Sequence, residues 1–248
     1  MQKQKNKILI SLLIIILIAI IYVSLRIFNT LKDNSKLEKE ISEVKDEVII
    51  NEDNEVESEK VEEKISEEEK LELNFEKLKK INNDTVAWIR VINTNIDYPI
   101  VQTTNNTYYL DHSFYKEKNQ NGWIYESSNN SSSFDDANTV LFGHNTNGKT
   151  MFSELKDIYN GNYGKNINIS IFLENTTYTY KVFSIYLENP NNTTALSKYT
   201  NKDILNDYII KSNVNFGIDV NENDKILTFS TCNNMTDDRI IMHAKKIS

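Results

Sequence analysis

The sequence predicts a mainly β fold, a closed antiparallel-rich barrel or a sandwich, that follows a membrane segment and a charged stalk. Eight short runs rich in β-branched and aromatic residues succeed one another between residues 85 and 247. Few helical segments interrupt these runs, which is typical of an all-β architecture. Roughly 175 residues are enough to build one hydrophobic core. We therefore expect one folded domain over residues 73–248.

The N-terminus carries the first element, an apolar segment. Residues 8–25 hold no formal charge and consist mainly of Ile and Leu, which is long enough to cross a bilayer. Lys3, Lys5 and Lys7 precede this segment, and positive charge tends to stay in the cytoplasm. A cleaved secretory signal is the alternative, but the segment offers no convincing small-x-small cleavage site. We expect residues 1–7 to be cytoplasmic, residues 8–25 to be an uncleaved anchor in the plasma membrane, and the rest of the chain to be extracellular.

An acidic stalk is expected over residues 26–72. Residues 33–72 contain 17 acidic and 6 basic side chains, a net charge of −11 that exceeds the −8 of the whole chain. Leu37, Ile41, Val44 and Val48 recur at helical spacing, which permits a short amphipathic helix or a weak coiled coil. The Glu-rich run at 52–69 has too few apolar residues to bury a face and predicts a solvated spacer.

The folded domain is expected to begin with a short helix and continue as strands. Phe75, Leu78 and Ile81 mark that helix. Strands are expected at 85–91, 97–102, 123–126, 139–142, 167–173, 178–187, 226–231 and 239–247. Two more helices are expected, at 150–158 and 201–211. The aromatic residues assigned to the core are Trp88, Tyr98, Trp123, Phe152, Phe172, Tyr180 and Phe183.

Composition excludes several classes of function. The folded part carries no strongly basic face of the kind that binds nucleic acid. The sequence also lacks zinc-like cysteine spacing, a phosphate-binding glycine loop and a convincing calcium loop. We therefore expect no cofactor and no metal.

Cys232, the single cysteine of the chain, directly follows the strand expected at 226–231. A free cysteine is commonly a small buried hydrophobe, and that reading stays open from this residue alone. A thiol becomes a nucleophile when a cation favours its thiolate and a base or acid lies within reach. An exported protein with one thiol forms no internal disulfide, which is consistent with a catalytic use.

His144 and Arg239 are the candidate partners of this thiol. His144 follows a strand and Gly143, so it is expected at the rim of the sheet, where catalytic groups usually stand. His243 alternates within a strand, and His112 belongs to a polar surface segment. Arg239 comes seven residues after the cysteine; an alternative is that it simply pairs with a neighbouring aspartate at the rim.

Taken together, the motifs resemble those of the sortases, membrane-anchored cysteine transpeptidases. They are Thr228-Phe-Ser-Thr-Cys232, Gly143-His-Asn145 and Arg239, with Phe229 where the family usually has leucine. The class B branch is favoured by Asn83-Asp-Thr-Val-Ala-Trp-Ile-Arg90, Ile96-Asp-Tyr-Pro-Ile-Val-Gln102, Tyr108-Tyr-Leu110 and Lys149-Thr-Met-Phe152. The likeness runs in order over residues 74–248.

This resemblance implies an eight-stranded sortase barrel, with helices at its N-terminus and before the penultimate strand. It also implies that Cys232 cleaves a C-terminal sorting signal after threonine and forms a thioester. His144 would transfer protons, and Arg239 would stabilise the oxyanion or hold the substrate carbonyl. An amine of peptidoglycan, or of its lipid-linked precursor, would resolve the thioester. The expected partners are therefore exported proteins with sorting signals and the cell wall.

The same resemblance suggests Asn106, Leu110, Ser230 and Thr231 as contacts of the signal. Leu110 as a core residue and Asn106 as an ordinary turn residue are equally good readings of those two positions. Two other functions remain open from the sequence. One is a cysteine peptidase that hydrolyses without transfer, and the other is a membrane-tethered adhesin or scaffold that only binds.

Overall fold

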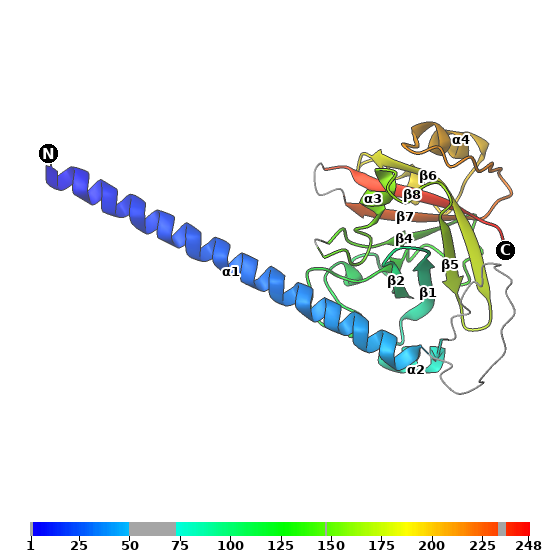
Figure 1. The fold of residues 1–248 in the computed structure, drawn as a ribbon, viewed down its shortest axis with the longest axis horizontal. Coiled ribbons are helices and arrows are strands. Elements are labelled where there is room, and N and C mark those ends of the chain that lie inside the picture. Colours follow the sequence, from blue (N-terminus) through cyan, green and yellow to red (C-terminus); the bar gives the residue numbers. More distant parts are fainter. Residues whose placement is uncertain (1, 50–72, 147, 233–236) are drawn as a thin grey trace, which may run out of the picture.

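A closed barrel of eight strands forms the folded part of the chain (Figure 1). The structure is a computed structural model that describes residues 2–49, 73–146, 148–232 and 237–248. The strands are β1 (Thr85–Val91), β2 (Asp97–Val101), β3 (Tyr125–Glu126), β4 (Asn138–Phe142), β5 (Asn168–Phe172), β6 (Thr177–Glu188), β7 (Ile226–Cys232) and β8 (Arg239–Lys246). They follow one another around the barrel as β1-β2-β3-β4-β7-β8-β6-β5, and β5 pairs with β1 to close it. The prediction of an eight-stranded barrel is confirmed.

Four α-helices and two 3-10 turns accompany the barrel among the described residues. They are α1 (Gln2–Val48), α2 (Phe75–Ile81), η1 (Tyr108–Leu110), α3 (Leu155–Tyr159), η2 (Thr194–Leu196) and α4 (Lys202–Lys211). The helix expected before the penultimate strand is α4. The helix expected from residue 150 begins only at Leu155. Met151 is excluded from it by a φ of 54°, which no right-handed helix accepts, and residues 152–154 form turns.

Alternation along the strands separates an inner from an outer face. Leu141, Phe229 and Met242 are register partners on β4, β7 and β8, and all three lie in the barrel core. On the other face of β7 and β8, Ile226 and Ile241 pack in a second cluster with Leu205 and other residues of α4. Six of the seven aromatic residues predicted for the core are buried, and Phe172 is half-buried.

Two pairs in the barrel are parallel, β2 with β3 and β4 with β7. In the second pair, Leu141 is opposite Phe229 and Phe142 is opposite Ser230. Both strands therefore run in the same direction and end at the same rim of the barrel. The next strand, β8, pairs antiparallel with β7 and starts at that rim, with Arg239 opposite Cys232.

The long helix α1 is packed against the barrel at its C-terminal end (Figure 1). Leu37, Val44 and Val48 are buried there, with at most 1% of their surface exposed. Glu40 accepts a hydrogen bond from the backbone N–H of Tyr115 at 2.7 Å. The amphipathic spacing expected at these positions is thus a helix that covers the barrel. Residues 37–48, which the sequence assigned to the stalk, belong to the packed structure; the expected spacer at 52–69 lies outside the described residues.

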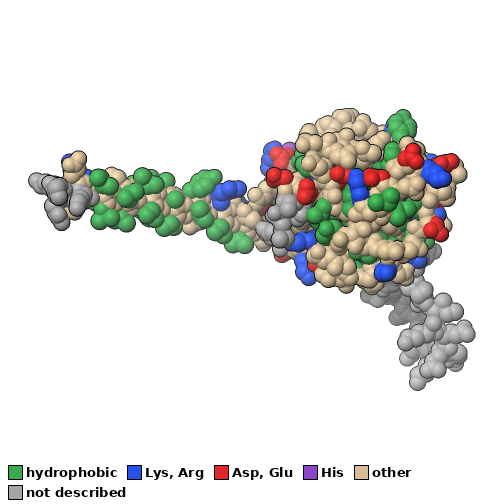
Figure 2. Space-filling model, turned by 90° about the horizontal axis from the view of Figure 1, so that it is seen from above, with side chains coloured by type: hydrophobic (Ala, Val, Ile, Leu, Met, Phe, Trp, Pro, Cys, Tyr) green, Lys and Arg blue, Asp and Glu red, His purple; other side chains and the backbone are tan. Residues whose placement is uncertain are grey.

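The N-terminal half of α1 stands clear of the barrel. Its side chains at 8–25 are exposed and mostly apolar, and Figure 2 shows this hydrophobic surface along the arm. By length and composition, α1 is the one described helix that could cross a membrane. The apolar exposure continues past Arg26 through Ile27, Phe28 and Leu31.

Candidate active site

The ends of β4 and β7 bring the predicted site residues to one rim. The parallel register continues past β4, since the N–H of Gly143 donates to the carbonyl of Ser230 at 3.3 Å. From Phe142 and its partner Ser230, each chain reaches a predicted catalytic residue two positions later, His144 and Cys232. Neighbouring strands lie about 4.8 Å apart, so these two backbones end side by side. The backbone of Cys232 is described, whereas its side chain lies outside the described atoms.

A groove of about 260 Å³ opens at this rim. The described residues that line it are Asn106, Leu110, Tyr125, Phe142, Gly143, His144, Leu196, Ser230, Thr231 and Arg239. Every predicted site residue whose side chain is described is therefore part of one groove. Among these lining residues, Arg239 is the one with a permanent charge. An apolar wall with one guanidinium suits an extended peptide whose carbonyl oxygen needs a partner.

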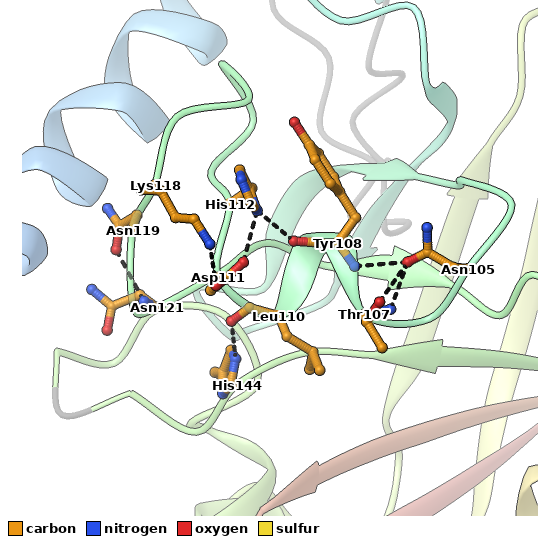
Figure 3. Close-up of polar contacts among 10 residues, drawn as sticks. All are labelled: Asn105, Thr107, Tyr108, Leu110, Asp111, His112, Lys118, Asn119, Asn121 and His144. Atoms are coloured by element: carbon orange, nitrogen blue, oxygen red, sulfur yellow. Dashed lines mark hydrogen bonds and ion pairs between the residues drawn. The ribbon is translucent and has the colours of Figure 1, made fainter.

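His144 makes a hydrogen bond to the opposite wall of the groove. Its Nε2 lies 2.7 Å from the carbonyl oxygen of Leu110. Figure 3 draws this contact between the two residues. A carbonyl oxygen only accepts, so Nε2 carries the hydrogen and the neutral ring has its basic lone pair on Nδ1. The carbonyl of His144 accepts from the N–H of Phe152 at 2.9 Å, which fixes the backbone of the residue.

Two glycines allow the walls around His144 to come close together. A Cβ on Gly143 would lie 2.7 Å from Cδ2 of Phe152, a core residue that packs edge-on against Phe229. Gly122 has a φ of 55°, and a Cβ there would lie 2.3 Å from the carbonyl oxygen of Tyr109. Both positions therefore require glycine because another part of the backbone or core approaches them closely.

The turn η1 that presents Leu110 is held by the side chain of Asn105, which lies just before it (Figure 3). The Oδ1 of Asn105 accepts from the backbone N–H groups of Thr107 and Tyr108, both at 2.9 Å. Leu110 itself is 43% exposed, so the alternative of a core leucine is wrong for this residue. Its carbonyl is turned to His144 and its side chain lines the groove.

The other predicted contact residues differ in how their polar atoms are used. Asn106 accepts from the N–H of Ser128 at 2.7 Å and also lines the groove, so its role as a turn residue is compatible with a role in binding. The hydroxyl oxygens of Ser230 and Thr231 are buried and have no hydrogen-bond partner among the described residues. These two hydroxyls are candidates for pairing with a bound peptide.

The remaining histidines are structural. His243 is fully buried, and burial lowers its pKa to about 3. It lies between the hydroxyls of Thr228, 2.8 Å from Nδ1, and Tyr186, 3.1 Å from Nε2. His112 stacks on Tyr108 with ring centroids 4.0 Å apart, outside the groove. His144 is thus the one histidine that lines the groove.

Sequence reasoning missed the aromatic part of the groove. Tyr125 and Phe142 are register partners on β3 and β4, and their rings stack with centroids 5.1 Å apart. Leu196, from η2, completes this apolar wall. Both residues lie on the same face of the barrel wall as Ser230, so strand parity could have identified them. Using parity, however, requires the register between strands that are far apart in the sequence. In the described part of the chain, no group of three His, Cys, Asp or Glu side chains could hold a metal ion.

Comparison with known proteins agrees with this arrangement. The Sortase domain family model matches residues 89–247. Sortase B of Listeria monocytogenes is 30% identical over 179 residues, 69% of this chain and 73% of that protein. Sortase B of Clostridium perfringens, as a crystal structure, superposes with a TM-score of 0.65 at 37% identity, covering 71% of this chain and 100% of that chain. The Staphylococcus aureus sortase B–substrate complex gives a TM-score of 0.63 at 31% identity, covering 70% and 84%.

A barrel of this topology, with a histidine and an arginine in one groove beside a strand-end cysteine, defines a cysteine transpeptidase. The chain belongs to the sortase family, and its relatives and structural neighbours place it in class B. The resemblance drawn from the motifs is thereby confirmed. The non-catalytic adhesin and the purely hydrolytic peptidase are not the class to which this chain belongs.

Proposed function

We propose that this sortase cleaves a C-terminal sorting signal after threonine and joins the exported protein to an amine of peptidoglycan. The observation that carries the proposal is the single groove lined by His144, Arg239 and the predicted contact residues at the ends of β4 and β7. Its apolar lining suits the side chains of an extended signal. The hydroxyls of Ser230 and Thr231, which have no partner in the part of the chain that the structure describes, suit its backbone.

In the first step, the thiolate of Cys232 attacks the backbone carbonyl carbon of the threonine in the sorting signal. The C–S bond forms, the scissile C–N bond breaks, and His144 delivers a proton to the departing amine. Arg239 carries a charge at any working pH and stabilises the oxyanion that develops on the carbonyl oxygen. The register pair Cys232–Arg239 supports this assignment, because the two backbones are directly opposite.

In the second step, an amine replaces the thiolate. The amine nitrogen attacks the thioester carbon, the new C–N bond forms, and the C–S bond breaks. His144 takes the proton that the amine loses, which restores the thiolate and the protonated imidazole with which the first step began. A peptidoglycan peptide, on the wall or on its lipid-linked precursor, supplies this amine in our proposal.

The location proposed for this chemistry is the outer face of the plasma membrane. Residues 8–25 would be the anchor, residues 1–7 would remain in the cytoplasm, and the barrel would be extracellular. The exposed apolar surface of α1 and the lysines before it support this orientation.

A panel of candidate signal peptides, offered to the full chain in detergent, tests the proposed reaction. We expect cleavage after threonine and a thioester on Cys232 that mass spectrometry detects after an acid quench. Cys232→Ala should abolish both, and His144→Ala should lower kcat by about 10²- to 10⁴-fold. The control is His112→Ala, which lies outside the groove and should keep its rate. Full cleavage by Cys232→Ala would refute the proposed nucleophile.

A further inference from the structure

A second groove, of about 480 Å³, lies on the other side of His144. One wall is α1, and the other walls are the turn before β3 and the loop that follows β4. The described residues that line it are Thr30, Asn34, Gln120, Asn121, His144, Asn145 and Thr146. His144 therefore separates two grooves, the peptide groove described above and this one beside α1.

The wall formed by α1 is bonded to the barrel at this place. The side-chain amide of Asn121 donates to the Oδ1 of Asn34 at 2.9 Å. Two residues further along α1, Lys36 forms an ion pair with Glu117. Asn119 adds a third contact to α1, because its side-chain amide donates to the carbonyl of Asp33 at 3.3 Å. The groove is thus a feature of the docked helix, and it would not exist on the barrel alone.

The lining has a distinct chemistry. Apart from the His144 imidazole, its described residues carry only hydroxyl and carboxamide side chains, with no charge and no large apolar group. Such groups can each donate or accept hydrogen bonds, which matches the alternating N–H and C=O groups of a peptide backbone. The peptide groove, in contrast, is largely aromatic and aliphatic and contains Arg239.

The position of the groove along α1 relates it to the membrane. At 1.5 Å per residue, Thr30 and Asn34 lie about 8 and 14 Å beyond Leu25, the last residue of the apolar segment. The headgroup region extends roughly 5–8 Å beyond the hydrocarbon on each side. Ile27, Phe28 and Leu31 expose apolar side chains within this interval, which suits a position among the headgroups. The groove would therefore open at the surface of the bilayer.

We propose that this second groove binds the peptide that bears the acceptor amine, with α1 as one wall, and that the acceptor enters from the membrane side. The inference rests on the proposed transpeptidation. The sorting signal occupies the peptide groove and the acceptor strand occupies the groove beside α1. The amine then reaches the thioester carbon past His144, which takes its proton as the C–N bond forms and the C–S bond breaks.

Filling the groove with a bulky side chain tests this assignment in the full chain, with a signal peptide that the wild type cleaves. The probes are triglycine and hydroxylamine, a large and a small amine. In Asn34→Trp, and independently in Gln120→Trp on the facing wall, the ratio of triglycine transfer to hydroxylamine transfer should fall about tenfold, equivalent to 1.4 kcal/mol of lost binding. Ser35→Trp, the exposed neighbour on α1, should keep the wild-type ratio.

The membrane-side approach is tested by moving the barrel outward. Seven helix-forming residues inserted between Arg26 and Ile27 add about two turns, or roughly 10 Å, and nearly restore the helix face. In vesicles that contain a lipid with a triglycine headgroup, transfer to that lipid should fall about tenfold, while transfer to soluble triglycine should not change. The same seven residues inserted after Met1 are the control.

The outcomes separate this proposal from the proposed function. If the wild type forms no thioester with any signal peptide, the proposed function itself fails. If the wild type transfers normally and both tryptophan variants keep its ratio of products, the second groove does not bind the acceptor. If the insertion leaves transfer to the lipid probe intact, the approach from the membrane side is wrong.

Discussion

At the scale of single residues, the site depends on Gly143 having no side chain as much as on the side chains that line the groove. Gly143 lies against the ring of Phe152, and Phe152 in turn packs against Phe229 in the core. Through these contacts the interior of the barrel determines where the backbone before His144 can lie. A well-packed interior yields little to an added methyl group.

Gly143→Ala should therefore destabilise the domain and misplace His144. The added Cβ would approach the Phe152 ring to 2.7 Å, an overpacking that costs about 1–3 kcal/mol. Urea unfolding and kcat for peptide cleavage measure the two effects. Gly148→Ala is the matched control, because its Cβ would find the nearest atom at 3.5 Å. Adding Phe152→Leu to Gly143→Ala should restore part of the loss; equal unfolding midpoints for Gly143→Ala and wild type would disprove the contact.

Glu126 is a second residue with a measurable effect, on the inner side of β3. It is fully buried, neither carboxyl oxygen has a partner among the described residues, and burial, with Asp136 nearby, raises its pKa to about 9. A raised acid pKa means that the folded state retains a proton that the unfolded state loses. Its contribution is thus fully present below the pKa of the unfolded chain, near 4.3, and is lost as the pH rises to about 9.

Glu126→Gln should remove this dependence on pH. From pH 5 to pH 8.5 we expect the free energy of unfolding of the wild type to fall by up to about 1.4 kcal/mol per pH unit more than that of the variant. Urea midpoints across this range provide the measurement, and Glu222→Gln, an exposed change, is the control. Parallel pH profiles for wild type and Glu126→Gln would show that this carboxyl ionises normally.

At the scale of elements, the parallel pair β4–β7 explains why a histidine and a cysteine nearly ninety positions apart belong together. The alternating pattern of each strand was visible in the sequence, and so the strand bounds were predicted to within a few residues. The register between strands was not, because it depends on contacts across the barrel. Consequently Tyr125 and Phe142 were missed, while His144, Cys232 and Arg239 were found through their motifs; their catalytic roles stay predictions.

The element least well anticipated is α1. The spacing of Leu37, Val44 and Val48 correctly predicted a helix. Such a spacing does not show which surface the apolar face of the helix packs against. Packing against the barrel explains why Glu40 is buried. Its carboxylate accepts a hydrogen bond from the N–H of Tyr115, a contact that the local sequence does not predict. The second groove was missed for the same reason, since it exists only between elements.

A protein that begins at residue 30 should accordingly be more stable than one that begins at residue 74. Fully burying each Leu or Val side chain contributes about 1.5–3 kcal/mol as an upper estimate, so we expect a difference of at least 3 kcal/mol. Urea unfolding of the two proteins gives the value. Within the longer protein, Val44→Ala should lower the midpoint and the exposed Ser42→Ala should not. Identical midpoints for the two lengths would mean that α1 does not pack on the barrel in solution.

At the scale of the whole molecule, α1 is one continuous helix. Its N-terminal half is apolar and exposed, and its C-terminal end packs on the barrel. The proposed anchor therefore leads directly into the wall of the second groove. The lone cysteine makes the orientation measurable. In intact cells, a thiol reagent that does not cross membranes should label the full chain at Cys232, and alkaline carbonate should leave the protein in the membrane.

Removal of residues 2–25 should release the protein from the carbonate-washed membrane, since it removes the apolar surface of α1. Cys232→Ala is the control for labelling, because it eliminates the only thiol. Labelling that requires broken cells would place the barrel on the cytoplasmic side and overturn the proposed location.

If the apolar end of α1 lies in the membrane as proposed, the packing of its other end on the barrel would allow rotation about the helix axis but little tilting. The catalytic groove would then stay at a nearly constant height above the bilayer and would turn around the axis of α1. Encounters would then be governed by lateral diffusion of two membrane-bound molecules in a plane. A cargo already released into the wall would be out of reach, however well its signal fitted.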